Sequence, residues 1–248
     1  MKSLADRATP RFFAAMRLSP GAEIELPERA SRHCSVLRLR EGDPITLFNG
    51  EGGEHAAELT RISRDAVRAR VTATRAIERE SSLAVTLAQC VSGGDRMDIA
   101  VQKATELGAV RIVPIASERS VVKLSSERAD RRVAHWRNVV IAACEQCGRN
   151  RIPDVAAIVD LRTFVSTAAG SDESRLVLAP DVSQDLKRIK PPRAVTLLIG
   201  PEGGLAPEER RSAEEAGFVP VSFGPRVLRT ETAPLAAIAA MQAMWGDC

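Results

Sequence analysis

A continuous apolar run that stops at a glycine-rich turn constrains the fold of this chain more than any other feature. Residues 195–199 have the length and composition of a strand that is buried on both faces. Residues 200–204 follow at once and read Gly-Pro-Glu-Gly-Gly. Their glycines permit positive φ angles and let a ligand approach the backbone closely. Strands buried on both faces occur mainly in parallel sheets that helices cover, so the run predicts an α/β fold.

A second glycine-proline turn follows later in the same stretch. Residues 207–217 have the pattern of a helix, with proline and acids in its first turn and glycine at its end. Residues 218–223 then predict a short strand, which ends in a loop at residues 224–229. In open parallel sheets, ligands bind outside the carboxyl ends of the strands. Two such loops at two strand ends therefore predict one small-molecule site.

The rest of the chain divides into two parts by its patterning, and we place the boundary between residues 80 and 81. Residues 1–80 hold short strand patterns, including the turn signal Asn49-Gly50, which predicts a hairpin between residues 45–48 and 55–62. These features indicate a compact β-barrel-like module. Residues 81–248 alternate strand and helix patterns, which predicts a mostly parallel sheet with helices on both faces. The predicted helices are residues 95–107, 127–147, 158–169, 207–217 and 234–245.

Composition narrows the class of protein only a little. The formal net charge of +3 is too small to indicate nucleic-acid binding by itself. No apolar run reaches membrane-spanning length, and the first ten residues lack the apolar core of a signal peptide. The five cysteines have no spacing typical of a disulfide framework. We therefore expect reduced thiols in a cytoplasmic protein that does not enter a membrane.

Two motifs, in the right order, resemble a known family. They are Leu198-Ile199-Gly200-Pro201-Glu202-Gly203-Gly204 and Val227-Leu228-Arg229-Thr230-Glu231-Thr232-Ala233. Together they resemble the signature of the SPOUT methyltransferases, and specifically of the RsmE family, which methylates N3 of a uridine in 16S rRNA of the small ribosomal subunit. Further similar segments are residues 103–108, 119–120 and 145–149, so the resemblance covers nearly all of the chain from Arg11 onward. Phe223, where the family tends to have leucine, and Pro225 depart from the pattern of the third loop.

The resemblance implies an architecture, a cofactor and partners. Residues 1–80 are expected to form a PUA-like barrel that handles RNA, and residues 81–248 a SPOUT domain whose C-terminal segment forms a trefoil knot. The family acts as a homodimer on 16S rRNA or the small subunit. Its methyl donor is S-adenosylmethionine, held in a bent shape between three loops. The residues implied for the cofactor are Leu178, Ala179 and Pro180 in the first loop, Ile199, Gly200, Pro201, Glu202, Gly203 and Gly204 in the second, and Phe223, Gly224, Pro225, Arg226, Val227 and Leu228 in the third.

Arg229 and Glu231 are the candidate catalytic residues. Methylation at uridine N3 requires loss of the N3 proton, after which negative charge spreads onto the flanking carbonyl oxygens. A guanidinium in a dry site would stabilise that charge, and Arg229 is the candidate. Glu231 could accept the proton or orient Arg229. The alternatives are a phosphate contact for Arg229 and a helix N-terminal cap for Glu231.

Several cations are candidates for contact with RNA phosphates. The alternative for each is a solvated surface charge or a helix-capping residue. His33, beside the basic residues Arg29 and Arg40, is expected to be an ordinary surface or packed histidine without an acid–base role. The predicted RNA contacts are Arg11, Arg32 and Arg38 in the first module and Lys103, Arg119 and Arg149 in the second.

Other interpretations of the same residues are weaker. A phosphate-binding Walker loop needs Gly-Lys-Ser/Thr after its glycines, and Glu202 would repel a phosphate. Cys144 and Cys147 form a Cys-x-x-Cys, but no second ligand pair at zinc spacing exists, and a redox pair would begin a helix rather than end one. We expect structural thiols and no metal. Two other functions stay open: a SPOUT enzyme acting on another RNA or base atom, and a non-catalytic RNA-binding protein of this fold.

Overall fold

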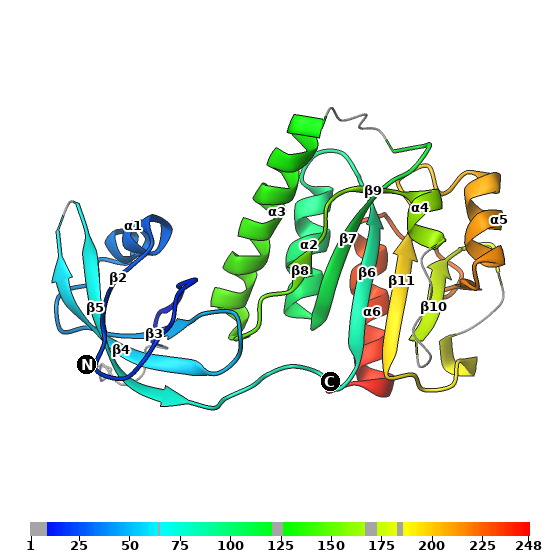
Figure 1. Ribbon diagram of the computed structural model, residues 1–248. Coiled ribbons are helices and arrows are strands. Elements are labelled where there is room, and N and C mark those ends of the chain that lie inside the picture. The colour runs from blue at the N-terminus through cyan, green and yellow to red at the C-terminus, as the bar shows by residue number, and fades with distance from the viewer. Residues whose placement is uncertain (1–8, 64, 121–125, 167–172, 183–185) are drawn as a thin grey trace. The chain divides into compact units, whose positions relative to one another are not determined.

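The computed structural model describes residues 9–63, 65–120, 126–166, 173–182 and 186–248. The chain forms two compact units, each drawn in Figure 1. The first unit is Met1–Glu80 together with Cys144–Ile152, and the second is Ser81–Ala143 together with Pro153–Cys248. The sequence placed residues 144–152 in the second part of the chain, whereas they pack with the first unit. The assignment of an RNA-handling and a catalytic role to the two parts stays a prediction at this point.

The first unit is a small mixed β-sheet with one helix, as its short strand patterns predicted. The hairpin around Asn49-Gly50 is present, because β3 and β4 pair antiparallel and Gly50 has a φ of 89°. Val67, Ala69 and Val71 are buried, while the arginines between them are exposed, which confirms a half-exposed strand. The elements are β1 (Arg11–Phe13), β2 (Glu23–Glu25), α1 (Glu28–Val36), β3 (Pro44–Phe48), β4 (Glu54–Ile62) and β5 (Val67–Arg75), with strand order β1-β3-β4-β5-β2.

Arg11 is held inside the first unit by partners from separate segments. Its Nη1 donates to Glu54 at 2.8 Å, and its Nη2 donates to Asn150 Oδ1 at 2.6 Å and to the Gly148 carbonyl at 3.1 Å. The guanidinium also lies 5.1 Å from the ring centre of Phe48. Because these internal partners engage both terminal nitrogens of the guanidinium, the structure contradicts the predicted RNA contact of Arg11. Its role is to fix residues 144–152 to β1 and β4.

Arg149 is also an internal residue. It is 4% exposed, and its guanidinium donates to both carboxylate oxygens of Glu80, from Nε at 3.0 Å and from Nη2 at 2.5 Å. Next to it, the buried Asn150 donates to the carbonyl of Ile77 at 2.6 Å. A buried ion pair of this kind is destabilising to break, because the remaining charge has no partner. The predicted RNA contact of Arg149 is therefore contradicted as well.

The second unit contains a sheet of seven strands, all parallel, as predicted. The predicted strand at residues 195–199 is its second inner strand, and every residue from Val195 to Ile199 is buried. The strands are β6 (Ala84–Cys90), β7 (Ala109–Ala116), β8 (Asp154–Val155), β9 (Val159–Asp160), β10 (Glu173–Leu178), β11 (Ala194–Ile199) and β12 (Val219–Val221), with order β12-β10-β11-β6-β7-β8 and β9 also on β7.

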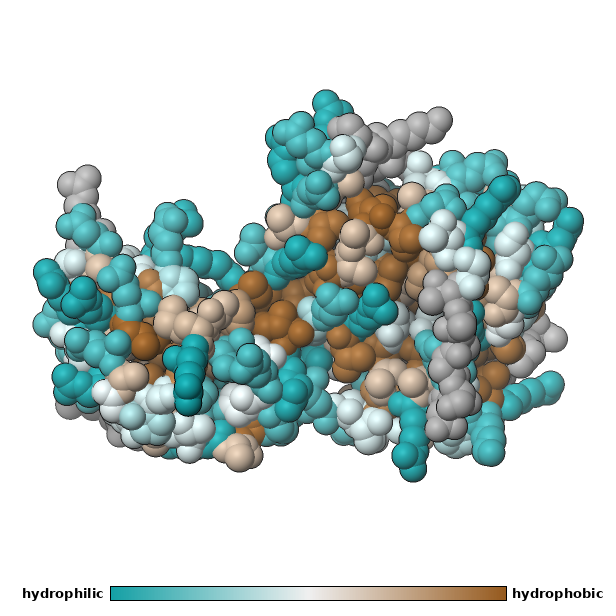
Figure 2. All heavy atoms as spheres, in the orientation of Figure 1, coloured by the Kyte–Doolittle hydropathy of each residue, from teal (hydrophilic) through white to brown (hydrophobic). Residues whose placement is uncertain are grey.

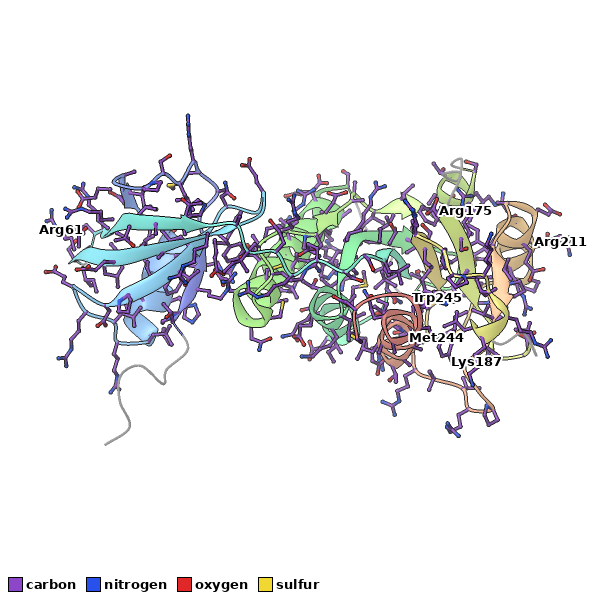
Figure 3. All side chains as sticks on the ribbon, turned by 90° about the horizontal axis from the view of Figure 1, so that it is seen from below. Arg61, Arg175, Lys187, Arg211, Met244 and Trp245 are labelled. Carbon is purple, nitrogen blue, oxygen red and sulfur yellow. The ribbon has the colours of Figure 1, made fainter. Side chains whose placement is uncertain are left out.

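Helices cover both faces of this sheet. On one face, apolar side chains of β6 and β11 pack with Ala104 of α2 and Ile238 of α6, and Figure 3 shows these two helices side by side. On the other face, Cys90 and Leu198 pack with residues of α4 and α5. Figure 2 shows hydrophilic residues (teal) over the outer side of α5. The helices are α2 (Arg96–Glu106), α3 (Ser126–Cys147), α4 (Leu161–Val165), α5 (Pro207–Glu215), α6 (Thr232–Trp245) and the short 3-10 helix η2 (Leu186–Arg188).

The predicted helix at residues 158–169 is wrong at its start. Val159 and Asp160 pair with β7 as strand β9, and the helix begins only at Leu161. Asp160 caps it, because its Oδ1 accepts hydrogen bonds from the backbone N–H groups of Arg162 and Thr163. The last three residues of the predicted helix, 167–169, lie outside the described residues. Across the described part of the chain, no helix is long and apolar enough to cross a membrane.

The C-terminal segment returns across the inner strands of the sheet. After the edge strand β12, the chain runs back to begin α6, which packs on β11. In this returning segment, the Thr230 hydroxyl donates to the Gly200 carbonyl after β11 at 2.8 Å, and Gln89 at the end of β6 donates to Thr230 at 3.1 Å. The returning segment is therefore held against the carboxyl ends of the two inner strands β6 and β11.

A candidate cofactor cavity at the carboxyl ends of three strands

A cavity of about 590 Å³ lies at the carboxyl ends of β10, β11 and β12. Three loops line it: the residues after β10, the glycine-rich turn after β11, and the segment between β12 and α6. These are the three loops that the sequence indicated. Every residue predicted for the cofactor lines the cavity except Gly203, Gly224 and Pro225, and both candidate catalytic residues, Arg229 and Glu231, line it too.

The glycine-rich turn has a fixed shape because of its backbone. The Gly204 N–H donates to the Pro201 carbonyl at 2.9 Å, and Gly204 has a φ of +67°, a conformation that favours glycine. Gly200 is needed for a different reason, because a Cβ at that position would lie 3.2 Å from the backbone nitrogen of Leu205. Gly203 has room for a side chain, since its nearest neighbours are Arg119 atoms at 3.7 and 3.8 Å.

Helix α5 holds the far side of the same turn. Pro207 is its first residue, as predicted, and the buried Glu209 accepts a hydrogen bond from the Ala206 N–H at 2.9 Å through Oε2. The other carboxylate oxygen of Glu209 accepts from the Glu118 N–H at 2.7 Å. Glu209 therefore satisfies a free amide at the helix N-terminus and fixes the loop after β7 beside the turn.

Arg96, which the sequence did not single out, joins two acids of the cavity wall. Its Nη1 donates to Glu202 Oε1 at 2.9 Å, and its Nε lies 3.8 Å from Glu231 Oε2. Glu202 Oε1 also accepts from the Gly93 N–H at 3.2 Å. Arg96 is the first residue of α2, directly after the loop that leaves β6. That position, at the carboxyl end of a neighbouring strand, is the signal by which the sequence could have indicated it.

Glu231 does not act as the helix N-terminal cap, which was its alternative role. It occupies the N-cap position of α6, but its side chain makes no capping hydrogen bond. Its Oε2 is buried and, among the described residues, has no hydrogen-bond partner. A buried carboxylate oxygen that accepts no hydrogen bond is costly to keep, and the Arg96 guanidinium 3.8 Å away offsets part of that cost. The geometry therefore favours a group that accepts a proton or a hydrogen bond from a ligand over a structural cap.

Arg229 is exposed at the cavity, and no hydrogen bond or ion pair of its side chain is found in the part of the chain that the structure describes. Its backbone carbonyl accepts from the N–H groups of Thr232 and Ala233 at 2.9 Å each, which fixes the residue at the start of α6. Its guanidinium therefore keeps its donors for a ligand. Both interpretations of Arg229, charge stabilisation and phosphate contact, are compatible with this placement.

A second ion pair, also missed from the sequence, forms the rim after β10. Both Nη1–oxygen distances from Arg210 to the Asp181 carboxylate are short, at 2.7 and 2.6 Å, and Arg210 Nε donates to Glu214 at 2.8 Å. The Arg210 hydrogen bonds lower the pKa of Asp181, which keeps it ionised. Asp181 directly follows the predicted Pro180, so the first loop extends one residue further than the sequence indicated.

The remaining predicted RNA contacts lie in different places. Arg119 is exposed, but its Nη1 donates to the Gly203 carbonyl at 3.0 Å, so it supports the glycine-rich turn. Lys103 pairs with Glu106 in the last turn of α2. Because α2 runs back from the carboxyl end of β6, Lys103 lies toward the amino ends of the strands. It does not line the cavity. Arg32 and Arg38 are exposed on the first unit, and their RNA contacts stay predictions.

The Cys-x-x-Cys pair has no reactive geometry. Cys144 is buried, its thiol donates to the Arg151 carbonyl at 3.7 Å, and burial raises its pKa to about 12. A thiol with that pKa is protonated at neutral pH and is a poor nucleophile or metal ligand. Over the described ranges, no group of three or more His, Cys, Asp or Glu side chains could hold a metal ion.

Known proteins match both parts of this chain. A family model described as an RNA methyltransferase domain matches residues 79–242, and one described as an RNA methyltransferase PUA domain matches residues 26–72. Two relatives are named ribosomal RNA small subunit methyltransferase E. That of Bacillus subtilis is 34% identical, with 84% of each chain covered. That of Buchnera aphidicola subsp. Schizaphis graminum is 30% identical, covering 96% of this chain and 97% of the relative.

Solved structures are also similar. A ribosomal RNA small subunit methyltransferase E from Neisseria gonorrhoeae, bound to S-adenosyl methionine, has a TM-score of 0.91 and 43% identity, covering 97% of this chain and 99% of that one. A Legionella pneumophila protein in complex with the bound cofactor SAM has a TM-score of 0.94 and 40% identity, covering 98% of this chain and all of that one. The parallel α/β unit with its cavity, the β-rich first unit and these matches agree. The chain belongs to the ribosomal RNA small subunit methyltransferase E (RsmE) family of SPOUT methyltransferases, with a PUA-like first domain.

Proposed function

We propose that this protein transfers a methyl group from S-adenosylmethionine to N3 of a uridine in 16S rRNA of the small ribosomal subunit. The observation on which the proposal depends is the cavity itself, where three loops of the parallel sheet enclose about 590 Å³ beside Arg229 and Glu231. That volume lies within the range of about 300–1,000 Å³ typical of small-molecule sites. The names of the relatives and the donor bound to two similar structures support the same reaction.

The charges of the cavity suit a donor that has both positive and negative groups. Four arginines and three acids line it: Arg96, Arg210, Arg226, Arg229, Asp181, Glu202 and Glu231. A ligand with ammonium, sulfonium and carboxylate groups can find opposite charges among these side chains. Ile199 and Phe223 add apolar surface, and the glycine-rich turn offers backbone groups without side-chain bulk. When bound, the donor supplies an electrophilic methyl group.

Arg229 and Glu231 are proposed to act on the acceptor uridine, and their positions in the cavity wall support this proposal. Glu231 lines the cavity, its Oε2 accepts no hydrogen bond among the described residues, and its carboxylate is proposed to receive the uridine N3 proton. Arg229, whose guanidinium has no partner among the described residues, can stabilise the negative charge that develops on the uridine carbonyl oxygens. Arg96 lies beside Glu231 and holds Glu202, so it keeps the acidic wall of the cavity in place.

We further propose that the protein acts as a homodimer in the cytoplasm. α6 is apolar almost all round, and one of its sides is buried in the core of the second unit. Its other side remains partly exposed, with Leu235, Ala236 and Ala239 half-buried. Met244, which Figure 3 labels on this helix, is 41% exposed. Ile99 of the neighbouring helix α2 is also 41% exposed. An apolar surface of this kind suits a second copy of the chain. Trp136 of α3 is buried within the chain and adds nothing to this surface.

The PUA-like first unit is proposed to bind RNA through its exposed cations. Arg32 lies 74% exposed on α1, and Arg38 follows that helix with a φ of 55°. Arg32 pairs with Glu28 at 3.5 Å, but both side chains are well exposed, so a phosphate can compete for the guanidinium, unlike those of Arg11 and Arg149. Binding that depends on phosphate contacts weakens steeply with salt. The logarithm of the association constant for rRNA should therefore fall linearly with the logarithm of the salt concentration. A flat response would contradict the phosphate contacts.

The experiment that tests this function uses a donor with a labelled methyl group. The protein is incubated with unmodified 16S rRNA and, separately, with assembled small subunits that lack the modification, and the RNA is digested to nucleosides. Label in 3-methyluridine is the expected result. Label in another nucleoside would indicate a SPOUT enzyme acting on another base atom, and no label with either substrate would indicate a non-catalytic RNA-binding protein. The control is RNA that has first been incubated with the protein and unlabelled donor, and it should accept no label.

A further inference from the structure

Thr230 is a buried residue between the two candidate catalytic residues. All three residues line the cavity, but Thr230 is only 6% exposed, and its hydroxyl is taken up by partners inside the protein. The hydroxyl of Thr230 is thus anchored to the protein at the point where the segment borders the cavity. A polar side chain that is buried in this position must be satisfied by specific partners.

The partners of Thr230 come from the ends of two inner strands. Its hydroxyl donates to the Gly200 carbonyl at 2.8 Å, and it accepts from Gln89 Nε2 at 3.1 Å. Gln89 is 1% exposed, and the same amide nitrogen donates to the Cys90 carbonyl at 3.2 Å. The relay Gln89–Thr230–Gly200 thus joins the end of β6, the returning segment and the glycine-rich turn.

Stability alone does not explain Gln89. Its amide oxygen is buried and has no hydrogen-bond partner among the described residues. An unsatisfied buried acceptor is destabilising, and an apolar side chain of similar size would avoid it. Only the donating half of the amide is used, and one of its two hydrogen bonds goes to Thr230. This pattern is expected of a residue kept to hold Thr230.

We propose that Thr230, held by Gln89, is a positioning residue that fixes the direction in which Arg229 and Glu231 face the cavity, an inference that rests on the proposed function. The relay acts on both residues because Thr230 is the chain neighbour of each. Reacting groups that move by as little as about 1 Å can lose on the order of a hundredfold in rate. Most of the cofactor loops have supports of their own, such as the Gly204–Pro201 and Ala179–Val221 backbone hydrogen bonds.

The test compares Thr230→Val, which removes the hydroxyl at nearly constant volume, with Thr230→Ser, which keeps it. Thr230→Val should lower kcat at saturating donor by about tenfold or more, while the Kd for S-adenosylmethionine changes by less than about threefold. Thr230→Ser should restore kcat to within about threefold of the wild type. Without donor, the amides of Thr232 and Ala233 should exchange hydrogen about tenfold faster in Thr230→Val than in the wild type.

A matched control is Thr105→Val, because Thr105 is equally buried and its hydroxyl donates to the Val101 carbonyl within α2, away from the cavity. It should lower stability without changing kcat. If Thr230→Val fails to fold, Gln89→Leu replaces it, since the Thr230–Gly200 bond remains, and a smaller loss of kcat is expected. Unchanged kcat, or an equal loss in Thr230→Ser, would overturn the proposal. A wild-type protein that methylates no RNA would instead refute the proposed function.

Discussion

The replacement Gly200→Ala tests whether the glycine-rich turn is shaped for the donor. The new Cβ would lie 3.2 Å from the Leu205 nitrogen and 3.4 Å from the carbonyl carbon and Cα of Gly204, and all three are backbone atoms. They can make room only if the turn shifts by a few tenths of an ångström. Overpacking of this kind costs about 1–3 kcal/mol. If that energy is expressed as lost donor binding, the Kd should rise by about 5- to 150-fold, at about 1.4 kcal/mol per tenfold change.

The matched control is Gly203→Ala in the same turn. Gly203 does not line the cavity, and its added Cβ would make only ordinary contacts with Arg119. Its Kd should stay within about threefold of the wild type, since no backbone has to move. Titration calorimetry with S-adenosylmethionine measures both variants, and thermal unfolding checks that both are folded. Equal affinities for Gly200→Ala and Gly203→Ala would refute the argument that the close approach at Gly200 shapes the site.

Three further substitutions follow from the structure. Arg229→Ala should abolish turnover while calorimetry still detects donor binding, and unchanged turnover would refute its assignment. Arg96→Ala should lower kcat/KM by about tenfold through loss of the Glu202 contact, whereas its melting temperature should hardly change because the pair is half exposed. A normal kcat/KM would show that Arg96 is only a surface residue. Arg11→Met should lower the free energy of unfolding in urea by about 2–4 kcal/mol, because it leaves a nearly buried Glu54 with fewer partners; a loss below about 0.5 kcal/mol would contradict this internal role.

Glu54 should make the first unit sensitive to acid. Burial raises the pKa of this carboxyl, but hydrogen bonds from Arg11 and Arg79 outweigh burial and lower it below 4.5. A lowered pKa in the folded state gives stability that is present at neutral pH and is lost as the pH falls below about 4.5. Glu54→Gln should therefore be less stable than the wild type at pH 7 and should lose less stability between pH 5 and 3. If the free energies of unfolding of the two proteins fell equally between pH 5 and 3, the pairing of Glu54 with Arg11 and Arg79 would be contradicted.

The apolar runs of the chain predicted most of the second unit correctly. Residues 195–199 are buried on both faces of the sheet because β6 and β10 flank them and helices cover both sides. The helix start at residue 158 was wrong because a local hydrogen bond decided it. Asp160 can cap a helix that begins at Leu161, and Val159 then adds to β7. Apolar periodicity does not register a cap of this kind.

The charged residues were harder to predict, because a sequence does not show which charges meet. Arg11 and Arg149 resembled surface cations, yet residues 144–152 return to the first unit and bury both beside Glu54 and Glu80. Arg96 gave no motif and became visible only when the fold placed it against Glu202. The three cavity loops were predicted from the family resemblance, whereas the Arg210–Asp181 ion pair at the rim was not. Long-range pairing, which depends on the topology, accounts for each of these differences.

A crystal structure of the protein with S-adenosylmethionine tests the central claim most directly. The account predicts donor density in the cavity between the loops after β10, β11 and β12, with its methyl group directed toward the wall that holds Arg229 and Glu231. Donor bound elsewhere on the chain, or bound in the cavity with its methyl group turned away from both residues, would contradict it.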